Sequence, residues 1–294
     1  MKCTLLSLLS LVALGSAVPL KRAHGPSDAD ILNYALTLEH LEDTFYREAL
    51  QQYNLTSFLA SNYTNETYTR VQQISADESS HVSFLTSALT AAGAKPVEAC
   101  TYDFGYTDVA SFLATASVLE GVGVSAYLGA AADIMSKTYL TAAGSILTVE
   151  ARHSSYVRNT VGQLPFPAPF DNPLGLNEVY TLAAQFIKSC PETNAPLPVK
   201  AFPALAASSA DPMIQVGSKV MLALNGVVIE GTVYAAFITV AGPVFVDVTK
   251  ADGGFEVTVP EGIAGQSYVV LTSCNGTATD DTIVAGPAIV EVSA

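Results

Sequence analysis

The chain has 294 residues, of which 50% are hydrophobic and only 14% are charged. Its 27 acidic residues outnumber 13 basic residues, which gives a formal net charge of −14 at pH 7. So few basic residues exclude a surface that binds the phosphates of nucleic acid, and the large apolar fraction excludes a disordered chain. We expect a folded, acidic protein with one or two domains.

The N-terminal residues have the composition of a secretory signal peptide. Lys2 precedes an apolar run over residues 5–14, which ends at the small residues 15–17. This run is shorter than the roughly 20 apolar residues that a membrane anchor needs. A dibasic pair at 21–22 predicts a processing site, so residues 1–22 are expected to form a signal peptide and a short pro-segment. We expect a secreted, extracellular protein without a membrane anchor; association with the cell wall or with further copies of the chain stays open.

Four Asn-x-Ser/Thr sequons predict N-glycosylation, which agrees with passage through a secretory compartment. Three of them are crowded within fourteen residues, which predicts an exposed loop. The predicted acceptors are Asn54, Asn62, Asn65 and Asn275.

Removal of the signal peptide would leave three cysteines, an odd number for an oxidising compartment. Cys100 and Cys190 flank predicted helical segments, and we expect them to form a disulfide. Cys274 would then keep a free thiol. Another pairing, or a bond between two chains, is the alternative.

Apolar residues recur at helical spacing in four long segments and one short segment. A sequon-rich loop separates the first two segments, and prolines between 165 and 173 forbid a helix before the last one. The expected helices are 27–50, 68–92, 109–135, 138–161 and 175–188.

Five prolines between 191 and 213 predict a linker, and the periodicity changes beyond it. Val-rich runs separated by Asn-Gly, Gly-Pro and Asp-Gly-Gly turn signals predict short strands of an antiparallel sandwich. We therefore expect an α+β chain with a helical domain over 23–190, a Pro/Ala linker over 191–213 and a small all-β, sandwich-like domain over 214–294.

Two of the predicted helices carry the same Glu-x-x-His signature, which places a carboxylate and an imidazole on one helix face. One signature is Glu78 with His81, and the other is Glu150 with His153. A single signature is more often a solvated helix surface than a site. Two signatures in one predicted domain, which use two of only four histidines, favour a site.

The other two long helices each supply a glutamate that is followed seven residues later by a tyrosine. Glu39 precedes Tyr46, and Glu120 precedes Tyr127. Glu120 is the only charged residue between positions 108 and 133, and burial of such a carboxylate without a partner would be costly. Metal coordination removes that cost.

Four carboxylates and two imidazoles in a helical bundle are the ligand set of di-iron and di-manganese carboxylate proteins. Two divalent ions would balance the charge of the four carboxylates, and a ligand set without thiolate suits iron or manganese. We therefore predict two Fe or Mn ions held by Glu39, Glu78, His81, Glu120, Glu150 and His153.

Neighbouring residues are candidates for supporting roles. Tyr46 and Tyr127 are candidates to donate hydrogen bonds to the ligands, although tyrosines at this spacing also fill cores. Asp77 is a candidate support for an imidazole. Glu42 lies one turn from Glu39 and competes with it as a ligand.

The helical segments resemble the ferritin-like domain of secreted fungal proteins described as stress-response or desiccation-related. The resemblance rests on Leu38-Glu39-His40-Leu41-Glu42 with Phe45-Tyr46, and on Asp77-Glu78-Ser79-Ser80-His81. It covers residues 27–190 and implies a ferritin-like four-helix bundle with a short fifth helix and the same six ligands.

The ligand set favours an oxidoreductase that acts on peroxide or dioxygen, with catalase-like and oxygen-dependent reactions as variants. Metal sequestration is one alternative function. A structural stress protein, associated with glycan or the cell wall and without turnover, is the other.

Overall fold

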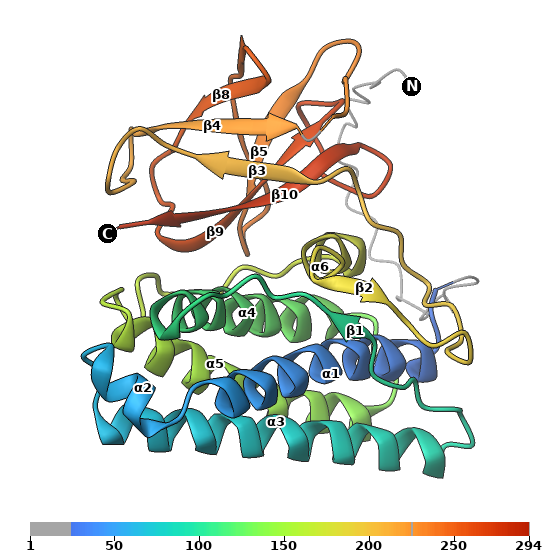
Figure 1. Ribbon diagram of the computed structural model, residues 1–294. Helices are drawn as coiled ribbons and strands as arrows, with labels where there is room; N and C mark the ends of the chain where they lie inside the picture. The colour runs from blue at the N-terminus through green and yellow to red at the C-terminus, as the bar shows by residue number, and fades with distance from the viewer. Residues whose placement is uncertain (1–24, 225, 294) are drawn as a thin grey trace.

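The computed structural model describes residues 25–224 and 226–293. The expected signal peptide and pro-segment, 1–22, lie outside the described residues. A helical region fills the lower half of Figure 1 and a β region lies above it. The protein is thus an α+β chain whose helices precede its main sheets.

Four long helices form the lower layer. They are α1 (Asp28–Gln52), α3 (Asn65–Ala91), α4 (Val109–Ala130) and α5 (Lys137–Thr160). Helix α1 packs along α3, and α4 packs along α5 (Figure 1). The bundle is therefore built from two helical pairs, and each pair contains one Glu-x-x-His signature.

Side-chain caps fix where these helices begin. Ser27 accepts a hydrogen bond from the backbone N–H of Asp30, whose carboxylate accepts one from Ser27 in return. Asp108 caps α4 in the same way through Ser111. Helix α4 ends at Ala130, five residues before the expected end at 135.

The sequon-rich segment is not only a loop, because it contains the short helix α2 (Leu55–Ala60). Asn54 caps this helix by accepting a hydrogen bond from the backbone N–H of Ser57 at 3.2 Å. Three predicted glycan acceptors in this segment and Asn275 are exposed, and their glycosylation stays a prediction.

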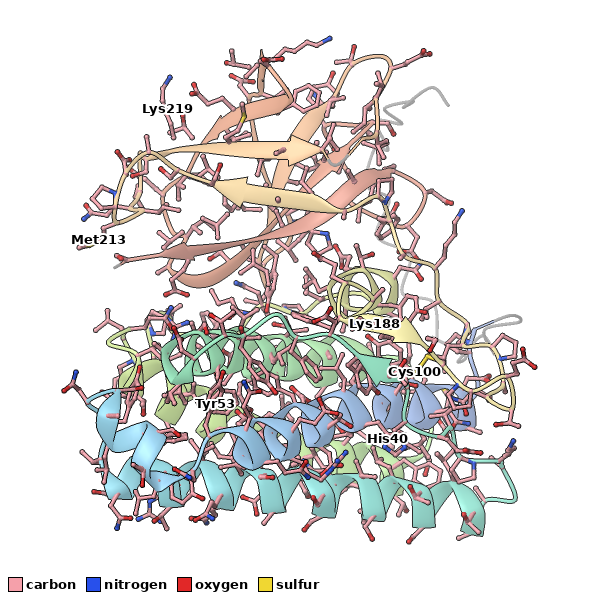
Figure 2. The ribbon with its side chains drawn as sticks, in the orientation of Figure 1. His40, Tyr53, Cys100, Lys188, Met213 and Lys219 are labelled. Atoms are coloured by element: carbon pink, nitrogen blue, oxygen red, sulfur yellow. A yellow bond between two sulfur atoms is a disulfide. The ribbon has the colours of Figure 1, made fainter. Side chains whose placement is uncertain are left out.

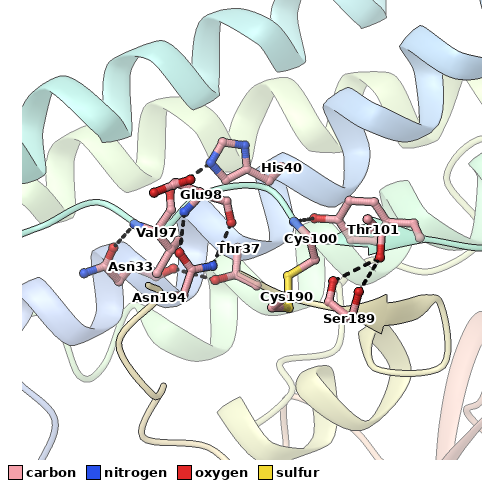
Figure 3. Close-up of a disulfide and its surroundings, with 11 residues drawn as sticks. Asn33, Thr37, His40, Val97, Glu98, Cys100, Thr101, Ser189, Cys190 and Asn194 are labelled. Atoms are coloured by element: carbon pink, nitrogen blue, oxygen red, sulfur yellow. Dashed lines mark hydrogen bonds between the residues drawn. A yellow bond between two sulfur atoms is a disulfide. The ribbon is translucent and has the colours of Figure 1, made fainter. Parts of the chain in front are cut away.

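Helix α6 (Leu176–Ala183) is shorter than expected, because the chain turns after it into strand β2 (Ile187–Ser189). Strand β2 pairs antiparallel with β1 (Thr101–Tyr102), and Cys100 and Cys190 form a disulfide at the end of this ribbon (Figure 3). The structure thus contains the disulfide that the sequence predicts. Cys274 is also disulfide-bonded, so the expectation of a free thiol there is wrong.

The β region contains two antiparallel four-stranded sheets, in the orders β10-β9-β5-β6 and β3-β4-β8-β7. Strand β3 lies in the segment expected to be a linker. The strands are β3 (Leu205–Ser208), β4 (Lys219–Leu224), β5 (Tyr234–Ile238), β6 (Val244–Val246), β7 (Thr249–Ala251), β8 (Gly254–Thr258), β9 (Gly265–Thr272) and β10 (Ile283–Val292).

The inner faces of the two sheets share an apolar core, to which Val220, Phe237 and Val269 contribute. The outer face of the sheet β3-β4-β8-β7 carries exposed charged residues, whereas Tyr268 and Val270, on the outer face of the other sheet, are buried against the helices. Lys219, at the outside of the β region in Figure 2, forms an exposed ion pair with Glu256 across 2.6 Å. Such a pair adds little stability, so burial of the inner face holds the sandwich together.

Strand β9 packs directly against α4. The hydroxyl of Tyr268 donates a hydrogen bond to the carbonyl of Gly121 at 3.0 Å, and Gln266 Nε2 donates one to the carbonyl of Val118 at 3.1 Å. A Cβ at Gly121 would lie 2.6 Å from the end of the Gln266 side chain, so a larger residue there would force this side chain to move. The buried Arg158 of α5 also pairs with Glu291 of β10, with N–O distances of 2.9 and 2.5 Å. The β region is thus fastened to the helices that carry the site.

Helix α4 is long and apolar enough, by length and composition alone, to cross a membrane. Within this fold, however, 67% of its apolar window is buried inside the protein. Its apolar character therefore has an explanation in the core, where it packs against α5, α6 and α1.

Candidate metal centre

The six predicted ligands meet in the middle of the bundle. Their carboxylate oxygens and imidazole nitrogens form two groups of four, and within each group all ligand atoms lie within 4.8 Å of one another. Both groups contain Glu78 and Glu150. The first group is completed by Glu39 and His81, and the second by Glu120 and His153.

The imidazoles face the carboxylates with the same ring atom. His81 Nδ1 lies 3.2 Å from Glu39 Oε2, 3.1 Å from Glu78 Oε2 and 3.2 Å from Glu150 Oε1. His153 Nδ1 lies 2.9 Å from Glu78 Oε1 and 3.5 Å from Glu120 Oε2. Each imidazole therefore belongs to one group, whereas each Glu-x-x-His glutamate belongs to both.

The chemistry of these residues fits a metal site. Several inward-facing atoms are buried without a hydrogen-bond partner among the described residues: Glu78 Oε1, Glu120 Oε2, both carboxylate oxygens of Glu150, and His153 Nδ1. Unsatisfied buried polar atoms are rare because each costs free energy. Their convergence from α3, α4 and α5 on one place is the pattern of a ligand set, and the described residues are compatible with a metal site.

Burial and mutual repulsion perturb the carboxyl groups. Burial, followed by the charge of Glu78, raises the pKa of Glu150 well above its usual value. Burial also raises the pKa of Glu120, and it raises that of Glu39 to about 7 although hydrogen bonding to His81 opposes it. Glu78 differs: despite its burial, the neighbouring imidazoles of His153 and His81 lower its pKa. The cluster thus lacks enough cations of its own.

The pKa values of the two imidazoles are raised, which favours their positively charged form. Burial opposes their charged form, but the carboxylates of Glu150, Glu39 and Glu78 raise the pKa of His81 to about 12. The carboxylates of Glu120 and Glu78 likewise raise the pKa of His153 to about 11. Both shifts show that this cavity favours positive charge.

The two tyrosines at the shared spacing each support a glutamate on the opposite helix. The hydroxyl of Tyr46 donates a hydrogen bond to Glu120 Oε1, and the hydroxyl of Tyr127 donates one to Glu39 Oε1. Both tyrosines are buried. They therefore hold the two glutamates that belong to one group each.

The two imidazoles differ in what lies behind them. His153 Nε2 lies 3.2 Å from Asp77 Oδ2, so Asp77 supports this imidazole. Asp77 precedes Glu78 in the sequence, and the corresponding position before Glu150 is Val149. No hydrogen bond to His81 Nε2 occurs among the described residues, and the two halves of the site are therefore unequal.

Glu42 belongs to neither group of four, and Glu39 occupies the ligand position for which the two compete. Glu42 is nevertheless buried at 5% exposure, and burial together with the charge of Glu150 raises its pKa well above the usual value. Gly123 lies between them: a Cβ there would be 3.1 Å from Glu42 Oε1 and 3.1 Å from Glu150 Oε2. Gly123 cannot be identified from the sequence, because its importance depends on distances between helices.

A polar pocket of about 400 Å³ opens at the imidazole end of the site. It lies between α3 and α5 and is lined by both histidines, Asp77, Arg70 and Arg152. His40 lies elsewhere: its Nε2 is 3.1 Å from the carbonyl oxygen of Val97, near the disulfide (Figure 3). Small molecules can thus approach the ligands from the edge of the bundle.

Comparisons with known proteins agree with this geometry. A family model described as a ferritin-like domain matches residues 27–163. Protein rds1 of Schizosaccharomyces pombe is 26% identical over 184 residues, which make up 62% of this chain and 45% of that protein. The chain therefore matches less than half the length of this curated relative.

A crystal structure of a conserved hypothetical protein from Mycobacterium tuberculosis is also similar, with 18% identity and a TM-score of 0.40. It covers 49% of this chain and 96% of that chain. The family match and the buried ligand groups lead to the same conclusion: this is an α+β protein whose helical region contains a ferritin-like domain.

Proposed function

We propose that the six ligands hold two Fe or Mn ions and that the filled centre carries out redox chemistry on peroxide or dioxygen. The observation that carries the proposal is the pair of four-residue groups that share Glu78 and Glu150. A cavity made for one ion would need only one such group. Two adjacent ions are useful for a reaction that exchanges two electrons.

Each residue has a role in this proposal. Glu39 and His81 would hold one ion and Glu120 and His153 would hold the other, and Glu78 and Glu150 belong to both ligand groups. When bound, the ions supply changes of oxidation state, and the overall reaction with peroxide is the conversion of two H₂O₂ into two H₂O and one O₂. Tyr46 and Tyr127 orient the unshared glutamates, and Asp77 orients His153.

Access in this proposal is from the imidazole end. The pocket between α3 and α5 reaches His81 and His153, whose side chains are 11% and 8% exposed, whereas the carboxylates are almost fully buried. A molecule as small as peroxide fits such an opening. Bulk water is kept from the carboxylates, which strengthens electrostatic interactions within the site.

Elemental analysis of the purified protein, combined with a peroxide consumption assay, tests the proposal. About two Fe or Mn ions per chain with peroxide turnover would support it. The variant Glu120→Gln should bind less metal and lose turnover, and Glu66→Gln, an exposed change on α3, should behave as wild type. Uptake of many ions would favour sequestration, and absence of metal after reconstitution would favour a structural role.

We also propose that the protein is secreted, in a role of stress protection. This proposal is supported by the N-terminal composition and by the exposed sequons. N-terminal sequencing of protein from a secretory host should find a mature chain that begins at Ala23. Glycosidase treatment should reduce its mass, whereas an intact N-terminus on an unglycosylated protein would contradict secretion.

A further inference from the structure

A second pocket, of about 430 Å³, lies where the helical region meets the β region. Helices α1, α4 and α6 form one side of it, and strands β3 and β10 form the other. Figure 1 shows these strands above α4 and α6. The volume is within the range of about 300–1,000 Å³ that small-molecule sites occupy.

The walls of this pocket are mostly apolar. Leu38, Leu119, Val122, Leu205 and Ile289 are among the side chains that line it. Its polar members are few, and one of them, Glu291, is already paired with Arg158. Apolar walls with a small number of placed polar groups are typical of sites for organic ligands.

The pocket lies next to the metal centre at Glu42 and Gly123, which both line it, although none of the six predicted ligands does. A Cβ at Gly123 would lie 3.1 Å from Glu150 Oε2, so the backbone of α4 approaches a shared ligand at the place where it also borders the pocket. A side chain there would separate the pocket from the carboxylates. The absence of one leaves the two spaces adjacent.

Glu42 is a buried carboxylate that neither ligand group uses. No described residue donates a hydrogen bond to Glu42, which is only 5% exposed; its oxygens are not among the fully buried atoms without a partner, so they keep some access to the pocket that Glu42 lines. Such a carboxylate costs free energy unless a partner satisfies it. A donor on a bound molecule would supply that partner.

We propose that this pocket binds an organic substrate of the di-metal centre: a small, mostly apolar molecule with one hydrogen-bond donor that contacts Glu42. The inference rests on the proposed function and adds a substrate class to it. Peroxide and dioxygen need no apolar chamber of this size. The imidazole-end pocket then serves the small oxidant, and the pocket between the two regions serves the organic molecule.

Calorimetric titration of the metal-free protein with 4-propylphenol tests the pocket itself. Wild type should bind the phenol, and Ala206→Phe, which fills the mouth from exposed strand β3, should bind at least about 10-fold more weakly. The control Ala201→Phe, an exposed change outside the pocket, should bind as wild type. Absence of binding by wild type, or equal binding by Ala206→Phe, would overturn the inference.

The role of Glu42 is tested by comparing the phenol with 4-propylanisole, which lacks the donor. Wild type should prefer the phenol by about 10-fold, because the phenol can hydrogen-bond to the carboxyl group of Glu42, whereas the ether leaves that group without a donor. Glu42→Leu should bind both compounds equally. If this variant does not fold, the preference of wild type still decides the point, and equal affinities there contradict the assignment.

NMR spectroscopy can test whether a molecule in this pocket lies close to the metal centre. In protein loaded with Mn(II), the ¹H resonances of bound 4-propylphenol should broaden strongly, and in Ala206→Phe they should not. Two ions per chain without phenol binding or broadening would overturn this inference and leave the proposed function intact. Phenol binding to a protein that takes up neither Fe nor Mn would overturn both.

Discussion

The hydroxyl of Tyr127 on α4 donates a hydrogen bond to the carboxylate of Glu39 on α1. The reciprocal contact runs from Tyr46 on α1 to Glu120 on α4. Each helix therefore offers a glutamate and, seven residues later, a tyrosine, and the antiparallel arrangement of the two helices makes each pair meet the other. The repeated spacing has a structural cause, which is mutual support of the two unshared ligands.

Tyr127→Phe should weaken binding of the ion that Glu39 holds by about 10-fold to 100-fold, because an oriented ligand loses its hydrogen bond. The measurement is a competition titration of Mn(II) against a chelator. Tyr34→Phe is the matched control: it removes another buried α1 hydroxyl, which donates to the carbonyl of Leu176 at 3.4 Å. Equal affinities in the two variants would contradict the role of Tyr127.

Glu150→Gln should reduce metal content more than Glu39→Gln does, because Glu150 belongs to both ligand groups and Glu39 to one. In the metal-free protein, Glu150→Gln should instead have a higher free energy of unfolding than wild type. Removal of a charge that burial and Glu78 disfavour should stabilise the metal-free protein by about 1–3 kcal/mol. Elemental analysis and chemical denaturation measure the two effects, and a less stable metal-free Glu150→Gln would contradict this account.

Asp77→Asn should weaken binding of the ion held by His153 by about 10-fold and leave the affinity for the other ion unchanged. Of the two imidazoles, only that of His153 has a carboxylate at its outer nitrogen. Stepwise metal titration resolves the two sites. Asp43→Asn is the control, since Asp43 lies on the nearby surface of α1 and accepts a hydrogen bond from Ser79 at 2.6 Å. Equal weakening at both ions would be the contrary result.

Glu178→Gln should stabilise the protein progressively as pH rises from about 4.5 to about 7, and fully above that range. Burial, opposed by a hydrogen bond from the backbone of Gly175 and aided by Asp280, raises the pKa of Glu178 from 4.5 to about 7. The folded state then binds this proton more tightly than the unfolded state, so stability falls as pH rises between these values. The full cost, up to about 3 kcal/mol, is present above the higher pKa.

Glutamine retains an acceptor for the N–H of Gly175, which Glu178 contacts at 2.6 Å. Denaturation of the metal-free protein should therefore show Glu178→Gln to be more stable than wild type at pH 8 and similar to it at pH 4. A difference that is the same at both pH values would show that ionisation of Glu178 is not its source.

The long helices and the ligand types could be predicted from the sequence because both depend on local spacing. The apolar period positions α1, α3, α4 and α5, and the paired Glu-x-x-His signatures identify the elements that face one another. Strand β3 and helix α2 could not be predicted, because each is short and takes its stability from neighbours. From composition alone, the segment of β3 is predicted to be a linker and the segment of α2 a loop.

The finer geometry of the site depends on how the helices are rotated and how closely they approach. Spacing cannot say that Glu78 and Glu150 are the shared ligands, or that Glu42 stands outside both groups. Residue spacing also does not distinguish Gly123 from the other glycines of α4, because its role depends on its distance to Glu150. The expectation of a free thiol at Cys274 follows only from the odd number of cysteines, and such a count cannot determine which cysteines pair.

X-ray absorption spectroscopy of Mn- or Fe-loaded protein can show whether two ions share Glu78 and Glu150 as ligands. We expect metal–metal scattering at a separation of about 3.5–4 Å, in an environment of oxygen and nitrogen ligands. Glu150→Gln should abolish this feature. Fully loaded wild-type protein without a metal–metal signal would contradict the shared-ligand centre.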